Sequence, residues 1–179
     1  MNTYDTMEPR PVDATIASDL RKGFRELYGE PARVYRAPGR VNLIGEHTDY
    51  NDGFVMPAAI GFCTRAAIAP RSDRKLVVRS ENFCEQLEFN LDELPDKGSG
   101  LWSDYVVGVA KTLSHSGSNL IGANLLVEGD VPQGAGLSSS ASLEVAVGYA
   151  LLDQAGEAID LTKLALLCQR AENEFVGAR

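Results

Sequence analysis

The sequence predicts an α+β fold, in which a strand-rich first half is followed by helices rather than alternating strictly with them. Two observations support this prediction. Short segments of strand-like composition, separated by turn residues, fill the middle of the chain at 61–70, 75–80 and 86–90. Apolar residues recur at helical spacing near the start and through most of the second half. At 179 residues, 44% of them hydrophobic, the chain is long enough to bury one domain core.

The first helix is expected to follow a flexible tail. Residues 1–12 are polar, include two prolines and show no periodicity, so they are assigned to that tail. Asp13 is a suitable N-cap, and Gly29 can end the helix that follows. Within this helix the apolar residues recur at helical spacing, at Ile16, Leu20, Phe24 and Leu27. The rest of the chain, 13–179, is expected to form one domain.

Strands are then predicted from alternation and from turn residues. A short strand over 33–36 is expected to end where Ala37-Pro38-Gly39 breaks it, and a strand-like piece covers 41–44. Another strand begins at 54–56, after the turn at 51–53. The remaining expected strands cover 61–70, 75–80, 86–90 and 120–128.

Three further helices are expected in the second half. Apolar residues at helical intervals predict one over 102–113 and another over about 139–154. Asp160 is an N-cap for the last helix. The buried face of that helix is expected to consist of Leu164, Leu167, Cys168 and Ala171.

A dense group of polar residues follows the first strand. Arg40, Glu46, His47 and Asp49 lie within ten residues. Such groups are costly in a core unless each finds a partner, but they suit a site that grips a small polar ligand. Carboxylates and imidazole accept hydrogen bonds from sugar hydroxyls, and arginine stabilises phosphoryl charge. A metal site is a weaker alternative, because adjacent Glu46 and His47 point in different directions in any regular element.

A glycine- and serine-rich run over 134–142 precedes the helix expected at 139–154. A strand, a glycine-rich turn and a helix in this order direct free backbone N–H groups and the positive helix end at an anion. The run is not a Walker A loop, because no lysine follows the glycines, and it lacks the third glycine of a dinucleotide fingerprint. A turn whose serines merely cap a helix remains the alternative.

Charge and hydropathy limit the partners. The formal net charge is −8 and no basic stripe is present, so no nucleic-acid partner is expected. No apolar run approaches the length of a membrane span, so no membrane partner is expected either. The N-terminus shows no secretory signal, and a cytoplasmic location is expected.

Together the two runs resemble the GHMP kinase superfamily. The segment Gly39–Gly53, GRVNLIGEHTDYNDG, resembles the signature of its galactokinase family with essentially no departure. The segment Gly134–Ser142, GAGLSSSAS, resembles the ATP-binding motif of the superfamily. The resemblance covers nearly the whole chain beyond the tail. It implies the N-terminal domain of a GHMP kinase, similar to the second domain of ribosomal protein S5, with a mixed sheet and helices packed on one side.

The resemblance also implies a reaction, the ATP-dependent phosphorylation of D-galactose at its C1 hydroxyl. Glu46, His47 and Asp49 would contact galactose, and Arg40 would stabilise charge on the transferring phosphoryl group. The cofactors would be ATP and Mg²⁺. The phosphate-binding residues would be Gly134, Gly136, Leu137, Ser138, Ser139 and Ser140.

Three residues complete the site that the resemblance implies. Ser140 and Glu172 would bind Mg²⁺. Trp102 would lie near the adenine, although a core anchor on an amphipathic helix is an equally good interpretation of this residue.

The chain departs from the family pattern at its end. In the family, the aspartate proposed as catalytic base follows shortly after the position of Arg179, and a second domain closes the cleft. We therefore expect an N-terminal part of a galactokinase, without its C-terminal domain, inactive alone and derived from a monomeric protein. Two alternatives stay open: a non-catalytic regulator that binds galactose and ATP, and a GHMP kinase for a related sugar.

Overall fold

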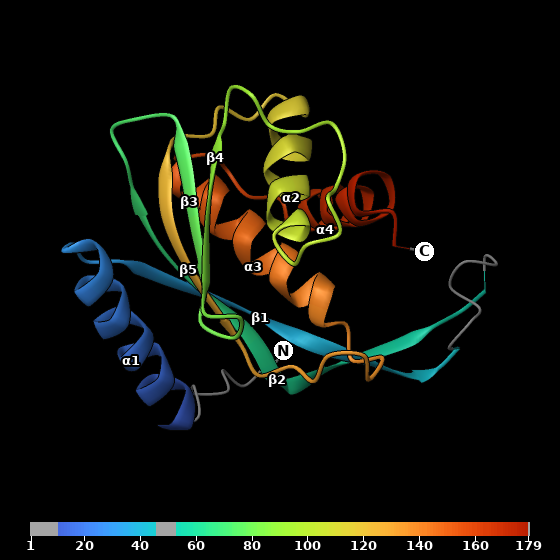
Figure 1. Cartoon of the computed structure of the whole chain (residues 1–179). Coiled ribbons are helices and arrows are strands. Elements are labelled where there is room, and N and C mark those ends of the chain that lie inside the picture. The colour runs from blue at the N-terminus through green and yellow to red at the C-terminus, as the bar shows by residue number, and fades with distance from the viewer. Residues whose placement is uncertain (1–10, 46–52, 179) are drawn as a thin grey trace.

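A five-stranded mixed sheet organises the computed structural model, which describes residues 11–45 and 53–178 (Figure 1). The strand order is β1-β2-β5-β3-β4, with β3 and β5 parallel and the other neighbouring pairs antiparallel. The expected α+β class and mixed sheet are confirmed. The elements in chain order are α1 (Pro11–Tyr28), β1 (Arg33–Ile44), β2 (Met56–Pro70), β3 (Lys75–Ser80), β4 (Glu85–Asn90), α2 (Asp104–His115), β5 (Ala123–Gly129), α3 (Ser139–Gln154), α4 (Leu161–Arg170) and the π-helical turn η2 (Ala171–Val176).

The first strand is longer than expected. The break predicted at Ala37-Pro38-Gly39 is wrong, because β1 continues through it and pairs with β2 on both sides. The pairing shifts register between Pro38 and Arg40, which marks a β-bulge or a similar irregularity. Proline has no N–H group to donate, and a bulge is a place where a sheet tolerates that loss. The pieces expected at 33–36 and 41–44 are therefore one strand.

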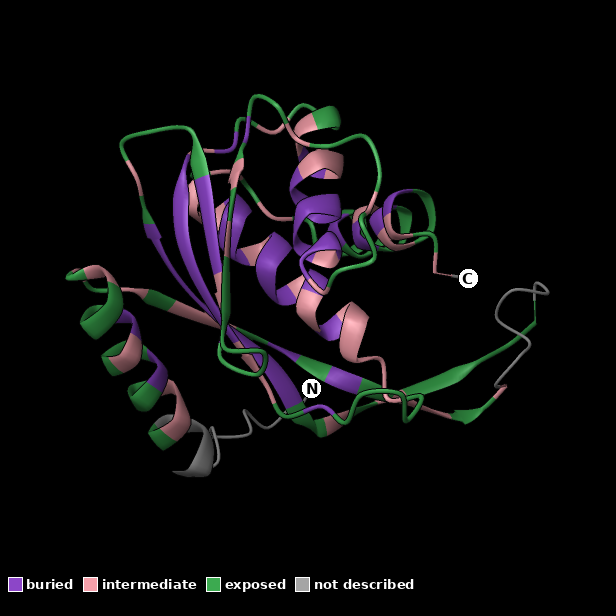
Figure 2. Ribbon diagram, in the orientation of Figure 1, coloured by how far each residue is buried: buried purple, intermediate pink, exposed green. Residues whose placement is uncertain are grey.

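The central strands bury both of their faces. Ala66 and Ile68 of β2 face a core formed with α2, α3 and α4, whereas Ala67 and Ala69 face α1. Side chains alternate across a strand, so consecutive residues of β2 enter different clusters. Figure 2 shows the buried residues concentrated in these strands and in α2 and α3. The helices α2, α3 and α4 pack on one face of the sheet, as expected, whereas α1 covers the opposite face.

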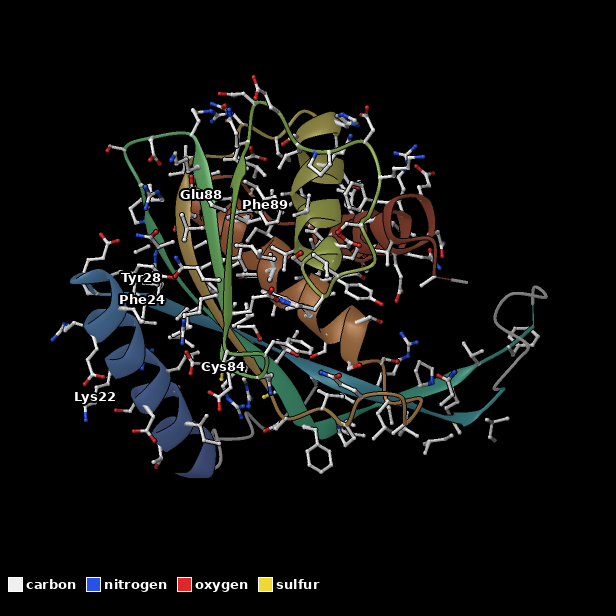
Figure 3. All side chains as sticks on the ribbon, viewed as in Figure 1. Lys22, Phe24, Tyr28, Cys84, Glu88 and Phe89 are labelled. Carbon is white, nitrogen blue, oxygen red and sulfur yellow. The ribbon has the colours of Figure 1, made fainter. Side chains whose placement is uncertain are left out.

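The helix α1 packs on its face of the sheet through a small apolar cluster. Phe24 is fully buried and its ring lies 4.7 Å from that of Tyr28, both directed at the sheet (Figure 3). Lys22 points away from the sheet. The helix begins at Pro11, two residues before the expected cap at Asp13, and ends at Gly29 as predicted. The first ten residues of the expected tail lie outside the described residues.

The remaining helix boundaries follow the sequence closely. The helix α3 has the expected bounds, and Asp160 caps α4 by accepting hydrogen bonds from two backbone N–H groups at 2.9 and 3.1 Å. The helix α2 begins two residues later than expected, so Trp102 precedes it. No helix in the described part of the chain is both long and apolar enough to cross a membrane.

Candidate active site

The loop before α3 adopts a backbone that leaves its N–H groups open to an anion. Gly134 and Gly136 have φ of +69°, and Ser138, the N-cap of α3, has φ of +59°. The Ser138 side chain makes no capping hydrogen bond, so the first N–H groups of α3 keep their donor capacity. These donors and the positive end of the helix converge on one point, as anion binding requires.

A hollow of about 320 Å³ lies at this helix end. It brings together three segments that are far apart in the sequence: β1, the loop before α3, and η2. Eight of the expected site residues line it, and among the described lining residues only Ala141 was not predicted. The lining consists of Arg40, Gly134, Gly136, Leu137, Ser138, Ser139, Ser140, Ala141 and Glu172.

The strand β1 approaches the loop at van der Waals distance. The Arg40 N–H donates a 3.0 Å hydrogen bond to the carbonyl oxygen of Leu137. A Cβ atom added to Gly39 would lie 2.8 Å from the same oxygen, closer than real Cβ contacts allow. The glycine of the first motif is therefore required by the loop of the second motif. This contact places the exposed Arg40 side chain at the hollow.

Ser142 fastens the first turn of α3 to the sheet. Its Oγ donates to the carbonyl oxygen of Ala37 at 2.7 Å and accepts from the Thr64 N–H at 2.9 Å. Ser142 and Thr64 are both buried. The last serine of the loop motif is thus a structural anchor, a role that the sequence alone did not distinguish from ligand binding.

Ser140 and Glu172 meet across the hollow. The Ser140 Oγ donates a 2.6 Å hydrogen bond to Glu172 Oε1, although the residues are 32 apart in sequence. Glu172 belongs to η2, and π-helical turns are frequent at functional sites.

The residues present fit Mg²⁺. No group of three or more His, Cys, Asp or Glu residues that could hold a metal occurs within 11–45 and 53–178. Magnesium needs no such group, because it is commonly held by one or two side-chain oxygens together with substrate phosphates. Ser140 and Glu172 supply two oxygens beside a helix end suited to phosphate.

A second hollow, of about 330 Å³, shares Gly134, Ser139 and Ser140 with the first. The Trp102 and Phe83 rings stack on one side of it, with centroids 5.7 Å apart and planes 15° apart. The Trp102 Nε1 donates to Glu85 Oε2 at 2.6 Å, which fixes the indole. A flat aromatic wall next to a phosphate-binding loop suits a nucleobase. Trp102 also packs against the main core. Its surroundings therefore fit both a residue near the adenine and a core anchor.

Asn82 is a residue of this second hollow that sequence reasoning missed. It exchanges two hydrogen bonds of 2.8 Å with the backbone of Gly129, one as donor and one as acceptor. These bonds hold the turn after β3 against the end of β5 and so position the aromatic wall. No sequence pattern indicates this pairing, because the two residues are 47 apart.

Glu144 is the second residue that the sequence analysis missed. It lies in α3 with 1% of its surface exposed, and its Oε1 has no hydrogen-bond partner among the described residues. Burial, and to a lesser degree the Glu172 carboxylate, raises the pKa of Glu144 to about 9. The signal was available: one acidic residue stands between Leu143 and Val145 in an apolar stretch.

The residues expected to contact the sugar cannot be placed in the same way. Glu46, His47 and Asp49 lie outside the described residues. The nearest described strands on either side, β1 and β2, pair with each other, and Ile44 lies opposite Met56 in their register.

Comparison with known families assigns both motifs. A family described as the galactokinase galactose-binding signature matches residues 22–70. A family described as the GHMP kinases N terminal domain matches residues 104–179. The two matched ranges do not overlap, and each contains one of the two motifs identified above.

Relatives and solved structures agree with these matches. A galactokinase from Chloroflexus aggregans is 50% identical over 167 residues, covering 90% of this chain and 42% of the relative. One from Roseiflexus sp. is 47% identical, with 90% and 41% covered. The structure of Lactococcus lactis galactokinase complexed with galactose superimposes with a TM-score of 0.87 at 41% identity, covering 92% of this chain and 44% of that one. The chain thus spans about two fifths of the length of these proteins.

More distant structures share the fold alone. The Methanococcus jannaschii mevalonate kinase superimposes with a TM-score of 0.72 at 20% identity, over 84% of this chain and 49% of that one.

Proposed function

Because this chain matches the N-terminal region of the galactokinases, in the GHMP kinase superfamily, we propose that it binds ATP and D-galactose for phosphoryl transfer to the C1 hydroxyl of the sugar. The observation that carries the proposal is the hollow where Arg40, the loop before α3 and Glu172 meet. One segment alone would make an ordinary turn. Three convergent segments with donors, a cation and a carboxylate make a site for a metal-bound nucleotide.

Each part of this site has a distinct task. The N–H groups at the start of α3 and the glycine-rich loop hold the phosphates of ATP. Ser140 and Glu172 hold Mg²⁺, which when bound neutralises phosphate charge. The Phe83–Trp102 wall receives the adenine. Glu46, His47 and Asp49 bind galactose through those of its hydroxyls that are distant from C1.

The chemistry is mainly positioning and electrostatic stabilisation, as in other phosphoryl transfers. The Arg40 side chain opposes the phosphate loop and stabilises negative charge that develops on the transferring group. We assign no catalytic base to this chain. A general base contributes about 10²–10⁴-fold in rate, so we propose that this chain, to which we assign none, binds ligands but by itself turns over little substrate.

Binding by the 179-residue chain tests the proposal first. Trp102 is its only tryptophan, so its fluorescence reports directly on the second hollow. We expect saturable changes with ATP in the presence of Mg²⁺, and galactose binding by calorimetry. Ser140→Ala and Glu172→Gln should weaken binding of the magnesium nucleotide, whereas Ser116→Ala, in an exposed position, should not. No nucleotide binding by the unaltered chain would refute the site.

A chimera tests the reaction. The chain is joined to the part of the Chloroflexus aggregans galactokinase that lies beyond the region it matches. Galactose-dependent release of ADP supports the kinase assignment, and competition with glucose and N-acetylgalactosamine tests its sugar selectivity. Ligand binding without ADP release in a folded chimera would favour a regulator instead. A cytoplasmic location, where ATP is available, and a monomeric state belong to the same proposal, and light scattering tests the latter.

A further inference from the structure

One helical turn beyond Ser140 lies a buried carboxyl group, one oxygen of which has no hydrogen-bond partner in the described part of the chain. Glu144 is 1% exposed, and its Oε1 makes no hydrogen bond within the described chain. An unsatisfied buried polar atom is costly, so each one in a native structure requires an explanation. Its neighbours Leu143 and Val145 pack against the apolar core, and a hydrophobic side chain would fit position 144 at lower cost.

Helix geometry places Glu144 on the face of α3 that carries Ser140. Ser140 and Glu144 are four residues apart, so they share a face of α3, and the longer side chain reaches back over the preceding turn. Glu172 approaches this face from η2 and accepts the hydrogen bond from Ser140.

The Ser140 hydroxyl has a single hydrogen to donate. In the structure it is donated to Glu172. When the oxygens of Ser140 and Glu172 both hold a cation, Glu172 is no longer the natural acceptor, and that hydrogen needs another one. The partnerless Oε1 of Glu144 is a buried acceptor on the same helix face.

We propose that Glu144 is a positioning residue, whose Oε1 accepts the Ser140 hydroxyl hydrogen when Ser140 and Glu172 bind the magnesium nucleotide. The inference rests on the proposed nucleotide site and adds a residue to it. Outer partners of metal ligands fix the orientation of those ligands, and their loss typically lowers metal affinity about 10–100-fold. A neutral carboxyl retains this acceptor oxygen, which suits its burial.

Two substitutions separate this role from a structural one. Glu144→Met removes the acceptor, and Glu144→Gln keeps a carbonyl oxygen at the same distance. Affinity for the non-hydrolysable analogue AMPPNP is measured with Mg²⁺ and with EDTA, using the full 179-residue chain. We expect Glu144→Met to weaken the magnesium complex about tenfold and to leave metal-free binding unchanged. Glu144→Gln should bind the magnesium complex within about twofold of the unaltered chain.

The thermal midpoint distinguishes loss of the acceptor oxygen from a disturbance of core packing. Glu144→Met removes an unpaired buried carboxyl, so its thermal midpoint should stay equal or rise while magnesium-nucleotide binding weakens. Leu151→Met, a volume-conserving change in the buried part of α3, is the matched control and should alter neither affinity.

The outcomes are distinct. Unchanged binding by Glu144→Met, or equal losses with and without Mg²⁺, would overturn the inference and leave the nucleotide site standing. Equal weakening by the Met and Gln variants would also overturn it, because an ionised carboxylate would then be needed. If the unaltered chain does not bind, the proposed function fails as well. A crystal structure of the unaltered chain with Mg²⁺ and AMPPNP decides independently: we expect Ser140 Oγ about 2.7 Å from Glu144 Oε1, and a different acceptor for Ser140 would refute it.

Discussion

The Ser142 hydroxyl donates a 2.7 Å hydrogen bond to the backbone carbonyl of Ala37, a residue 105 positions earlier in the chain. The same oxygen accepts a hydrogen bond from the Thr64 N–H at 2.9 Å. One buried serine therefore connects the first turn of α3 to both β1 and β2. This connection fixes the phosphate loop relative to the strand that carries Arg40, and it makes the geometry of the hollow dependent on the core.

Ser142→Ala should lower the free energy of unfolding by about 1–3 kcal/mol, because it leaves buried backbone groups of Ala37 and Thr64 without their partner. Urea unfolding followed by circular dichroism measures the change. Ser72→Ala, at an exposed turn position, should change stability by less than about 0.5 kcal/mol. Equal effects of the two substitutions would show that the Ser142 hydrogen bonds stabilise the fold no more than an exposed serine does.

Gly39→Ala should weaken nucleotide binding and lower stability, because the new methyl group would collide with the backbone oxygen of Leu137 at 2.8 Å. Neither that carbonyl nor the surrounding strand can move without displacing the loop. Overpacking of this kind typically costs about 1–3 kcal/mol. Calorimetric titration with AMPPNP and urea unfolding measure the two effects.

Gly23→Ala is the matched control, because a Cβ atom there meets Leu126 at an ordinary 3.9 Å. Gly23 lies inside α1, where alanine is favoured over glycine by about 0.8–1 kcal/mol. We expect this variant to be more stable than the unaltered chain, with unchanged nucleotide affinity. Destabilisation by both substitutions would contradict the collision at Gly39 as the cause.

The raised pKa of Glu144 predicts how stability depends on pH. The pKa is about 9 in the folded chain against an ordinary 4.5, so between these values the folded state retains a proton that the unfolded state releases. Stability from this group is therefore present at low pH and is lost as pH rises through this window, by at most about 1.4 kcal/mol per pH unit. Glu144→Gln does not titrate. The difference in unfolding free energy between the unaltered chain and this variant should fall from pH 5 to pH 9, and a constant difference would exclude the raised pKa.

Arg40→Met should lower kcat of the chimera by about 10²–10³-fold, the range found when a preorganised donor to transition-state charge is removed. Affinity for ADP should change little if Arg40 acts on the transferring group. Arg33→Met removes an exposed arginine that pairs with Asp153, outside the hollow, and should leave kcat unchanged. A loss of ADP affinity that accounts for the whole effect of Arg40→Met would assign this residue to nucleotide binding instead.

Local chemistry was enough to predict several elements. Alternation and turns defined β3, helical spacing and the serine run defined α3, and the Asp160 cap defined the start of α4. The loop before α3 was recognised as a candidate phosphate site because glycine, serine and a helix start are adjacent in sequence. These features depend on neighbours within a few residues, so no tertiary information was needed.

Two expectations failed because they depend on partners elsewhere in the chain. Pro38 was expected to end a strand, but pairing with β2 on both sides of the register shift carries β1 through it. The helices were expected on one side of the sheet, but the apolar face of α1 covers β2 and β5 from the other. Propensity acts locally, whereas the strand pairing around Pro38 and the burial of α1 involve residues 19 or more positions away.

The sequence by itself determined the order of the elements, the two motifs and the family likeness, since these are written in adjacent residues. The tertiary structure decided which of those residues meet. It placed Arg40 against the loop through Gly39, and it brought Glu172 to Ser140. It made Ser142 an anchor and Glu144 a buried acceptor. Hydrogen bonds and burial are set by packing between distant segments, and composition and periodicity carry no record of which segments will touch.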